Sequence, residues 1–319
     1  MKKFLTTLLF ISHLSGTDYI DYLHPFHPTT SSNGMVVSQN ALSSDIGVQI
    51  LDMGGNAVDA AVAVGFSLAT TLPRAGNLGG GGFMLVYLKD KNEIFYIDYR
   101  SKSPRNASIE KLLGTKKIPD RNSKLWERVD YTYLASGVPG TVYGLLEAHK
   151  NFGVLSLEKI MKPVIEQAEN GIVVSSDLNY VIDVTPQLRS DAESFSIFFD
   201  NGEPLKESSI MKRPDLANTF KEISKNGAKG FYEGAVADKI VEAMKKNGGL
   251  ITNEDLKDYK SFFRIPIALN YKGYMVYTAG PPSGGGITLL TALGVLNDID
   301  IKKYKSCLLY TSPSPRDSD

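Results

Sequence analysis

The sequence contains very little cysteine and no block of like charge. Cys307 is the single cysteine among 319 residues, which excludes an intramolecular disulfide framework and any zinc site built on several cysteines. Lys and Arg together number 35, as do Asp and Glu, so the formal net charge is zero. Without a cluster of positive charge, nothing indicates a nucleic-acid partner. A composition of 42% hydrophobic and 22% charged residues is that of an ordinary folded domain.

Motifs of nucleotide sites and serine hydrolases are also missing. Gly79–Gly82 form a run of four glycines, but a strand-like segment follows them, whereas a phosphate-binding loop needs Gly-Lys-Ser/Thr opening a helix. The nucleophile elbow Gly-x-Ser-x-Gly does not occur, since Ala135-Ser136-Gly137 and Pro282-Ser283-Gly284 both lack the flanking residues. His149, one of four histidines, is expected on the surface of a helix. The residues therefore predict no cofactor and no metal site, and they show no nucleophile.

The two ends of the sequence differ from the rest. Residues 1–16 begin with two lysines and a short apolar run, the pattern of a secretory signal peptide, without a clean Ala-x-Ala cleavage site. The run is too short to span a membrane. We expect a periplasmic or secreted protein, or a cytoplasmic one if residues 1–16 are not a signal. Residues 306–319 resemble translated cloning sequence, so we expect a non-native tail, and a natural chain that continues past residue 305.

Between these ends, helix and strand signals alternate. Met35–Ser38 is predicted to be a short buried strand. Asn56 can cap a helix from Ala57 to Thr70, and because that helix is apolar on nearly every face, we expect it to be central and buried. Ser156 and Pro163 are each predicted to begin a helix of their own.

The four glycines precede a predicted hairpin. Its strands are Phe83–Leu88 and a run ending at Asp98, joined by the polar turn Lys89–Asn92. Glycine loses more backbone entropy on folding than any other residue, so a run of four requires either positive φ angles or a close approach of the backbone to another group. We expect close approach around a small polar substrate, which Arg100 receives at the end of the second strand.

Several further motifs follow one another in order along the chain. They are Gly54–Ala63, Asn77–Met84, Asp98–Arg100, Ala135–Thr141, Asn247–Thr252 and Pro281–Gly285. Together these segments resemble the γ-glutamyltransferase (γ-glutamyl transpeptidase) family. The resemblance covers the large-subunit part of that family alone and indicates one domain over residues 34–305.

The resemblance implies an α+β fold, the αββα sandwich of the N-terminal-nucleophile hydrolases, here incomplete because its C-terminal half is missing. Precursors of this kind cut themselves, and the new N-terminal threonine of the small subunit is the nucleophile, with its own amino group as the base. The implied reaction cleaves the γ-glutamyl bond of glutathione and other γ-glutamyl compounds. The acyl group then passes to water or to amino-acid or dipeptide acceptors. The small subunit of the same precursor is the implied partner.

The resemblance assigns one substrate-binding residue on this chain and no catalytic one. Arg100 matches the arginine that binds the α-carboxylate of the γ-glutamyl group, and a guanidinium offers a carboxylate two parallel donors, which lysine does not. Because the nucleophile is expected beyond residue 305, we expect this chain alone to be inactive. A second hairpin is predicted over Ile265–Tyr271 and Tyr274–Thr278, and we expect the apolar faces of both hairpins to lack cover.

Three alternatives stay open at this point. Arg100 could pair with a surface acid at a strand end instead of binding substrate. The protein could be a cephalosporin or glutaryl acylase of the same fold, since those enzymes share the glycine motifs. It could also be a non-catalytic module that binds amino-acid-like ligands or a partner subunit. A downstream segment that begins with the nucleophilic threonine would favour the enzyme over the binding module.

Overall fold

The computed structural model describes residues 30–300 of the chain. The chain divides into two units, Met1–Met35 and Val36–Asp319. In the first unit only residues 30–35 are described, and they form no helix or strand. The predicted signal peptide at residues 1–16 and the predicted tail at 306–319 lie outside the described residues. Export to the periplasm or the medium therefore stays a prediction. Within residues 30–300, no helix is both long and apolar enough to cross a membrane.

The strand predicted at Met35–Ser38 is wrong. Val37 is 81% exposed, and the Ser38 amide donates to the Ser44 hydroxyl over 3.1 Å instead of to a neighbouring strand. The segment leads directly into α1 (Ala41–Asp52), whose first turn is capped by the side chain of Asn40. A short apolar run without a partner strand cannot satisfy its backbone hydrogen bonds as a sheet does. Here the Ser44 hydroxyl on α1 accepts the Ser38 amide instead.

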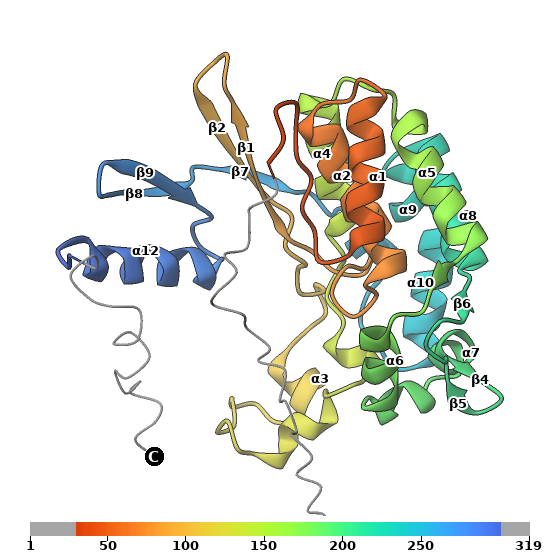
Figure 1. The fold of residues 1–319 in the computed structure, drawn as a ribbon. Coiled ribbons are helices and arrows are strands. Elements are labelled where there is room, and N and C mark those ends of the chain that lie inside the picture. Colours follow the sequence, from red (N-terminus) through yellow and green to blue (C-terminus); the bar gives the residue numbers. More distant parts are fainter. Residues whose placement is uncertain (1–29, 301–319) are drawn as a thin grey trace, which may run out of the picture. The chain divides into compact units, whose positions relative to one another are not determined.

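Helices are the main elements of the unit that follows (Figure 1). They are α1 (Ala41–Asp52), α2 (Ala57–Thr71), α4 (Thr141–Phe152), α5 (Leu157–Asn170), α8 (Pro214–Asn226), α9 (Lys229–Tyr232), α10 (Ala235–Lys246) and α11 (Asn253–Lys257).

The buried helix predicted after Asn56 is confirmed. Most residues of α2 are buried, and α1, α4 and α5 pack against it. Small residues allow these neighbours to come close: a Cβ added to Gly65 would lie 2.9 Å from the Leu145 side chain of α4. The Asn56 side chain accepts the amides of Val58 and Asp59, as the cap requires.

One helix, α5, runs where two were expected. Ser156 caps it, but Pro163 lies inside it and is buried. Proline lacks the N–H that would bond to the carbonyl of the preceding turn, so it usually interrupts a helix. Here Met161 and Val164 are fully buried beside it, and α5 packs against both α2 and α8. This burial offsets the lost hydrogen bond, and the helix continues.

Three antiparallel strands form the main sheet, in the order β1-β2-β7. They are β1 (Phe83–Leu88), β2 (Glu93–Asp98) and β7 (Phe262–Arg264). The hairpin β1–β2 has the predicted strands and turn. The third strand is not among the predicted ones; it joins β2 by pairing Arg264 with Tyr96. α4 covers β2, where the rings of Phe95 and Phe152 lie 4.9 Å apart.

A second hairpin precedes the last described helix. It consists of β8 (Ile267–Tyr271) and β9 (Tyr274–Thr278), and α12 (Gly284–Asn297) follows it. Lys272 at φ 50° and Gly273 at φ 89° form its two-residue turn, the left-handed geometry that suits the twist of a hairpin. α12 packs along β8, yet Gly286 alone among its residues is buried.

Shorter elements complete the described chain. They are α3 (Ile109–Leu113), η1 (Lys124–Arg128), η2 (Tyr133–Ala135), α6 (Ser176–Asp183), η3 (Pro186–Arg189), α7 (Ala192–Phe198) and the strand pairs β3 (Ile172–Val173) with β6 (Ile210–Met211), and β4 (Phe199–Asp200) with β5 (Glu203–Pro204).

Candidate functional site at the end of strand β2

The glycine run packs against the protein's own backbone at the end of β2. A Cβ added to Gly81 would lie 2.6 Å from the Tyr99 carbonyl oxygen, and one added to Gly82 would lie 2.8 Å from the Tyr99 ring. None of Gly79–Gly82 has a positive φ angle. Of the two explanations for the run, close approach therefore holds for Gly81 and Gly82. The expectation that they pack around a substrate is wrong, because Tyr99 and Ser101 occupy that space.

Asp98 is the last residue of β2 and connects three parts of the chain. It is 4% exposed. Its Oδ1 accepts the amide N–H of Arg100 over 3.0 Å, and its Oδ2 accepts Nε of Arg264 over 2.7 Å. A buried carboxylate is costly unless its oxygens are hydrogen-bonded. Here one oxygen fixes the turn at Arg100 and the other fixes the strand β7.

Tyr259 holds the same turn through the carbonyl of Arg100. Its hydroxyl donates to the carbonyl oxygen of Arg100 over 3.0 Å. Its ring is stacked on that of Tyr232, with centroids 5.8 Å apart and an interplanar angle of 6°. Burial raises the pKa of Tyr259, and the charge of Asp98 raises it further, so the phenol keeps its proton and stays a donor at neutral pH. The backbone of Arg100 is therefore held at both its N–H and its carbonyl.

The side chain of Arg100 is exposed, in contrast to its fixed backbone. Nη1 donates to the Pro282 carbonyl over 3.0 Å. The Tyr96 hydroxyl donates to the Gly280 carbonyl over 3.2 Å, so the glycine-rich turn before α12 is tied to β2 through Tyr96 and to the turn after β2 through Arg100. Among the residues that the structure describes, no carboxylate pairs with Arg100. The arrangement presents a guanidinium that is oriented by the neutral Pro282 carbonyl and can bind an anion from solution.

Lys102 lies close to this turn but its ammonium is engaged. Nζ donates to the Lys260 carbonyl over 2.7 Å and lies 4.3 Å from the centroid of the Phe262 ring. Burial lowers the pKa of Lys102, the charge of Asp98 raises it, and that of Arg264 lowers it. We therefore assign Lys102 to the support of the turn and the anion-binding role to Arg100 alone.

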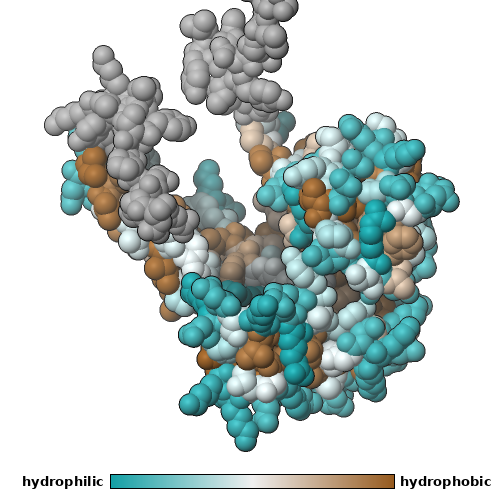
Figure 2. Space-filling model, turned by 90° about the horizontal axis from the view of Figure 1, so that it is seen from below, coloured by the Kyte–Doolittle hydropathy of each residue, from teal (hydrophilic) through white to brown (hydrophobic). Residues whose placement is uncertain are grey.

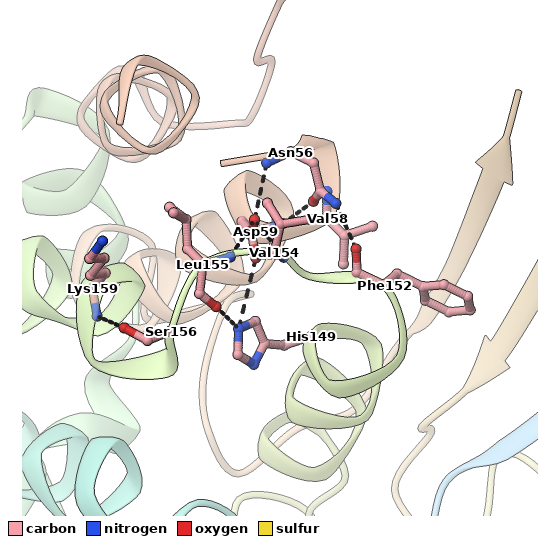
Figure 3. A network of polar contacts seen from close by, with 9 residues as sticks. All are labelled: Asn56, Val58, Asp59, His149, Phe152, Val154, Leu155, Ser156 and Lys159. Atoms are coloured by element: carbon pink, nitrogen blue, oxygen red, sulfur yellow. Dashed lines mark hydrogen bonds and ion pairs between the residues drawn. The ribbon is translucent and has the colours of Figure 1, made fainter. Parts of the chain in front are cut away.

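A second polar centre lies at the first turn of α2 (Figure 3). Asp59 is fully buried, and its carboxylate accepts the amides of Asn56 over 3.0 Å, Val154 over 3.1 Å and Leu155 over 3.3 Å. Every one of these donors is a backbone group of a loop or a helix start. The Asp59 network therefore ties the loop after α4 to the start of α2, and it leaves no group free to act on a substrate.

The prediction that His149 lies on the surface is wrong. Its side chain is 15% exposed. Nε2 donates to the Leu155 carbonyl over 2.8 Å and lies 3.8 Å from Oδ1 of Asp59 (Figure 3). The helix pattern of α4 did not reveal this, because the partners of His149 come from the following loop and from α2.

The comparison with protein families decides what this chain is. A family model described as Gamma-glutamyltranspeptidase matches residues 43–308. The chain belongs to the γ-glutamyltranspeptidase family. It is 43% identical over 284 residues to the glutathione hydrolase proenzyme of Escherichia coli (strain K12), a match that covers 88% of this chain and 47% of that protein. The chain thus spans about half the length of the curated relatives it matches.

Solved structures of the γ-glutamyltranspeptidase family agree with the fold. The crystal structure of Helicobacter pylori γ-glutamyltranspeptidase matches with a TM-score of 0.81 and 37% identity, covering 90% of this chain and 80% of that chain. A cephalosporin acylase from Bacillus halodurans is more distant, at 26% identity and a TM-score of 0.73, over 88% of this chain and 52% of that one. The predicted α+β fold of N-terminal-nucleophile hydrolases is confirmed, and the family prediction with it.

Sequence reasoning predicts Arg100 as a substrate-binding residue but does not identify the residues that hold it. Asp98 stands inside the motif Asp98–Arg100, so its position beside Arg100 was a usable signal. Tyr259 and Arg264 lie more than 150 positions further along the chain, as the sequence separations of their bonds to Arg100 and Asp98 show. No local pattern connects them to the site.

We expect Asp59→Asn to destabilise the chain by about 1–3 kcal/mol, because an amide removes the charge from a set of buried hydrogen bonds. Urea unfolding followed by circular dichroism measures the change. Asp45→Asn is the matched control, since Asp45 is exposed on α1 and should change the free energy of unfolding by less than about 0.5 kcal/mol. Equal stability of the two variants would contradict the assignment of the Asp59 network.

Proposed function

We propose that the complete protein is a glutathione hydrolase and γ-glutamyltransferase, and that this chain supplies the group that binds the α-carboxylate of the γ-glutamyl substrate. Arg100 is that group. The single observation that carries the proposal is an exposed guanidinium whose backbone is fixed on both sides and which has no carboxylate partner among residues 30–300. The name of the Escherichia coli relative, a glutathione hydrolase proenzyme, supports the substrate class and a precursor that is processed.

The geometry favours an arginine over any other cation here. One donor of the guanidinium is used by the Pro282 carbonyl, and further N–H groups of the planar fork remain for a ligand. Because Asp98 and Tyr259 hold the main chain, the entropy lost on binding is confined to the side chain. A glutamyl α-carboxylate is a planar anion that matches two parallel N–H donors. This complementarity supports the α-carboxylate as the ligand.

In the complete precursor, Arg100→Lys should raise KM for γ-glutamyl-p-nitroanilide about 10-fold to 100-fold, since a charge-assisted hydrogen bond contributes about 1.5–3 kcal/mol. Lysine keeps the charge but loses the second donor of the fork. Steady-state kinetics of the processed enzyme measures the effect. Arg74→Lys is the control, because Arg74 pairs with Asp177 at the surface. An unchanged KM for the Arg100 variant would return Arg100 to the role of a surface residue.

We also propose that the remaining part of the precursor, the small subunit, covers apolar surface that this chain leaves exposed. On α12, Ile287 is 47% and Val295 is 67% exposed; on β9, Tyr274 is 77% and Met275 is 52% exposed. Figure 2 shows hydrophobic side chains, in brown, at the surface of the segment that holds α12. Contiguous exposed apolar surface of this kind usually marks an interface. Of the two hairpins that were expected to lack cover, β8–β9 exposes apolar side chains, whereas α4 packs against β2 of the other hairpin.

The 319-residue chain alone should not turn over γ-glutamyl-p-nitroanilide, because we expect the nucleophilic threonine on the part of the precursor that covers α12. Release of p-nitroaniline by the purified chain tests this directly. The same assay on the complete precursor is the positive control. Turnover by the chain alone, at a rate above a heat-denatured sample, would place a nucleophile within these residues and contradict the proposal.

A further inference from the structure

We propose that Arg264 is a positioning residue that keeps the carboxylate of Asp98 from neutralising Arg100. The inference rests on the proposed role of Arg100 in binding a substrate carboxylate. It concerns a different residue, on a strand that the sequence motifs of the site do not include.

Asp98 lies where its carboxylate could compete with a substrate carboxylate for Arg100. Asp98 stands two residues before Arg100, and its Oδ1 already lies 3.0 Å from the amide nitrogen of Arg100. A free Asp98 carboxylate would therefore be a permanent competitor of the substrate, held at the high effective concentration of an attached group.

Arg264 removes this competitor by pairing with it. Its Nε donates to Oδ2 of Asp98 over 2.7 Å. The pair is specified by the sheet, because β7 places Arg264 opposite Tyr96 on β2, two residues before Asp98. The guanidinium of Arg264 also lies 5.3 Å from the Phe262 ring, which limits its orientation. The charges of Asp98 and Arg264 cancel, and the positive charge of Arg100 stays available.

Lys102 does not replace Arg264 in this task. It is the other cation near Asp98, but its ammonium donates to the Lys260 carbonyl over 2.7 Å and lies over the Tyr259 and Phe262 rings. Among the described residues Arg264 is accordingly the sole cationic side chain that forms an ion pair with Asp98.

The test is a set of variants in the complete precursor, assayed with γ-glutamyl-p-nitroanilide. Arg264→Gln should raise KM about tenfold while kcat changes by less than about twofold, because the freed carboxylate competes for Arg100 without touching the reacting bond. Adding Asp98→Asn to Arg264→Gln should bring KM back to within about threefold of the wild type. The asparagine oxygen still accepts the Arg100 amide, but the competing charge is gone.

A residue that merely stabilises the fold would give a different pattern. In that case the double variant would be no better than Arg264→Gln, and that result overturns the inference, as does an unchanged KM for Arg264→Gln. If Arg264→Gln does not fold, Arg264→Lys replaces it; it keeps a charge beside Asp98, and a tenfold or larger rise in KM would overturn the inference. Arg213→Gln, which breaks an ion pair with Asp215 on α8, is the matched control.

The result for Arg100→Lys separates the two proposals. A large rise in KM for Arg100→Lys together with no effect of Arg264→Gln refutes the role of Arg264 and leaves the proposed function standing. No effect of Arg100→Lys refutes the proposed binding site itself.

Discussion

The constraint on which this structure depends is the enclosure of Tyr99 by glycines. A Cβ on Gly82 would meet the Tyr99 ring, one on Gly144 would meet the same ring from α4, and one on Gly81 would meet the Tyr99 carbonyl. Gly140 is constrained in the same way by the Tyr99 carbonyl and the Tyr259 hydroxyl. Burial of this kind raises the pKa of Tyr99 to about 12. Glycines from two segments far apart in the sequence are thus required by the ring or the carbonyl of one residue, Tyr99.

The close packing around Tyr99 determines the position of Arg100, the next residue. Arg100 follows directly, its amide bound to Asp98 and its carbonyl bound to Tyr259, while its side chain reaches solvent and the Pro282 carbonyl. A binding group is most effective when its backbone does not have to be ordered by the ligand. The tightly packed Tyr99 and the exposed Arg100 therefore act together, because Tyr99 gives the backbone of Arg100 its rigidity.

The sequence was informative wherever the signal was local. The Asn56 cap and the alanine-rich run gave α2, and the polar turn at Lys89–Asn92 gave the hairpin β1–β2, because capping and turn chemistry act over a few residues. The ordered glycine motifs gave the family and the fold, which the comparisons confirm. The role of Arg100 in binding stays a prediction.

What the sequence did not reveal depends on contacts between distant segments. The helix α5 continues through Pro163 because the burial of neighbouring side chains offsets the lost hydrogen bond. His149 is enclosed by the loop after α4 and by α2. The strand that carries Arg264 is three residues long, too short for a periodic pattern, and its pairing with β2 spans most of the chain. Such pairings are decided by tertiary structure, so Tyr259 and Arg264 could not be found by reading along the chain.

The most direct measurement is a crystal structure of the complete enzyme with bound L-glutamate, the product of γ-glutamyl hydrolysis. We expect two guanidinium nitrogens of Arg100 within about 3 Å of the α-carboxylate oxygens, the geometry of a bidentate pair. We also expect the bond between Asp98 and Arg264 in that structure. A carboxylate bound elsewhere, with Arg100 paired to an acid of the protein, would contradict the account.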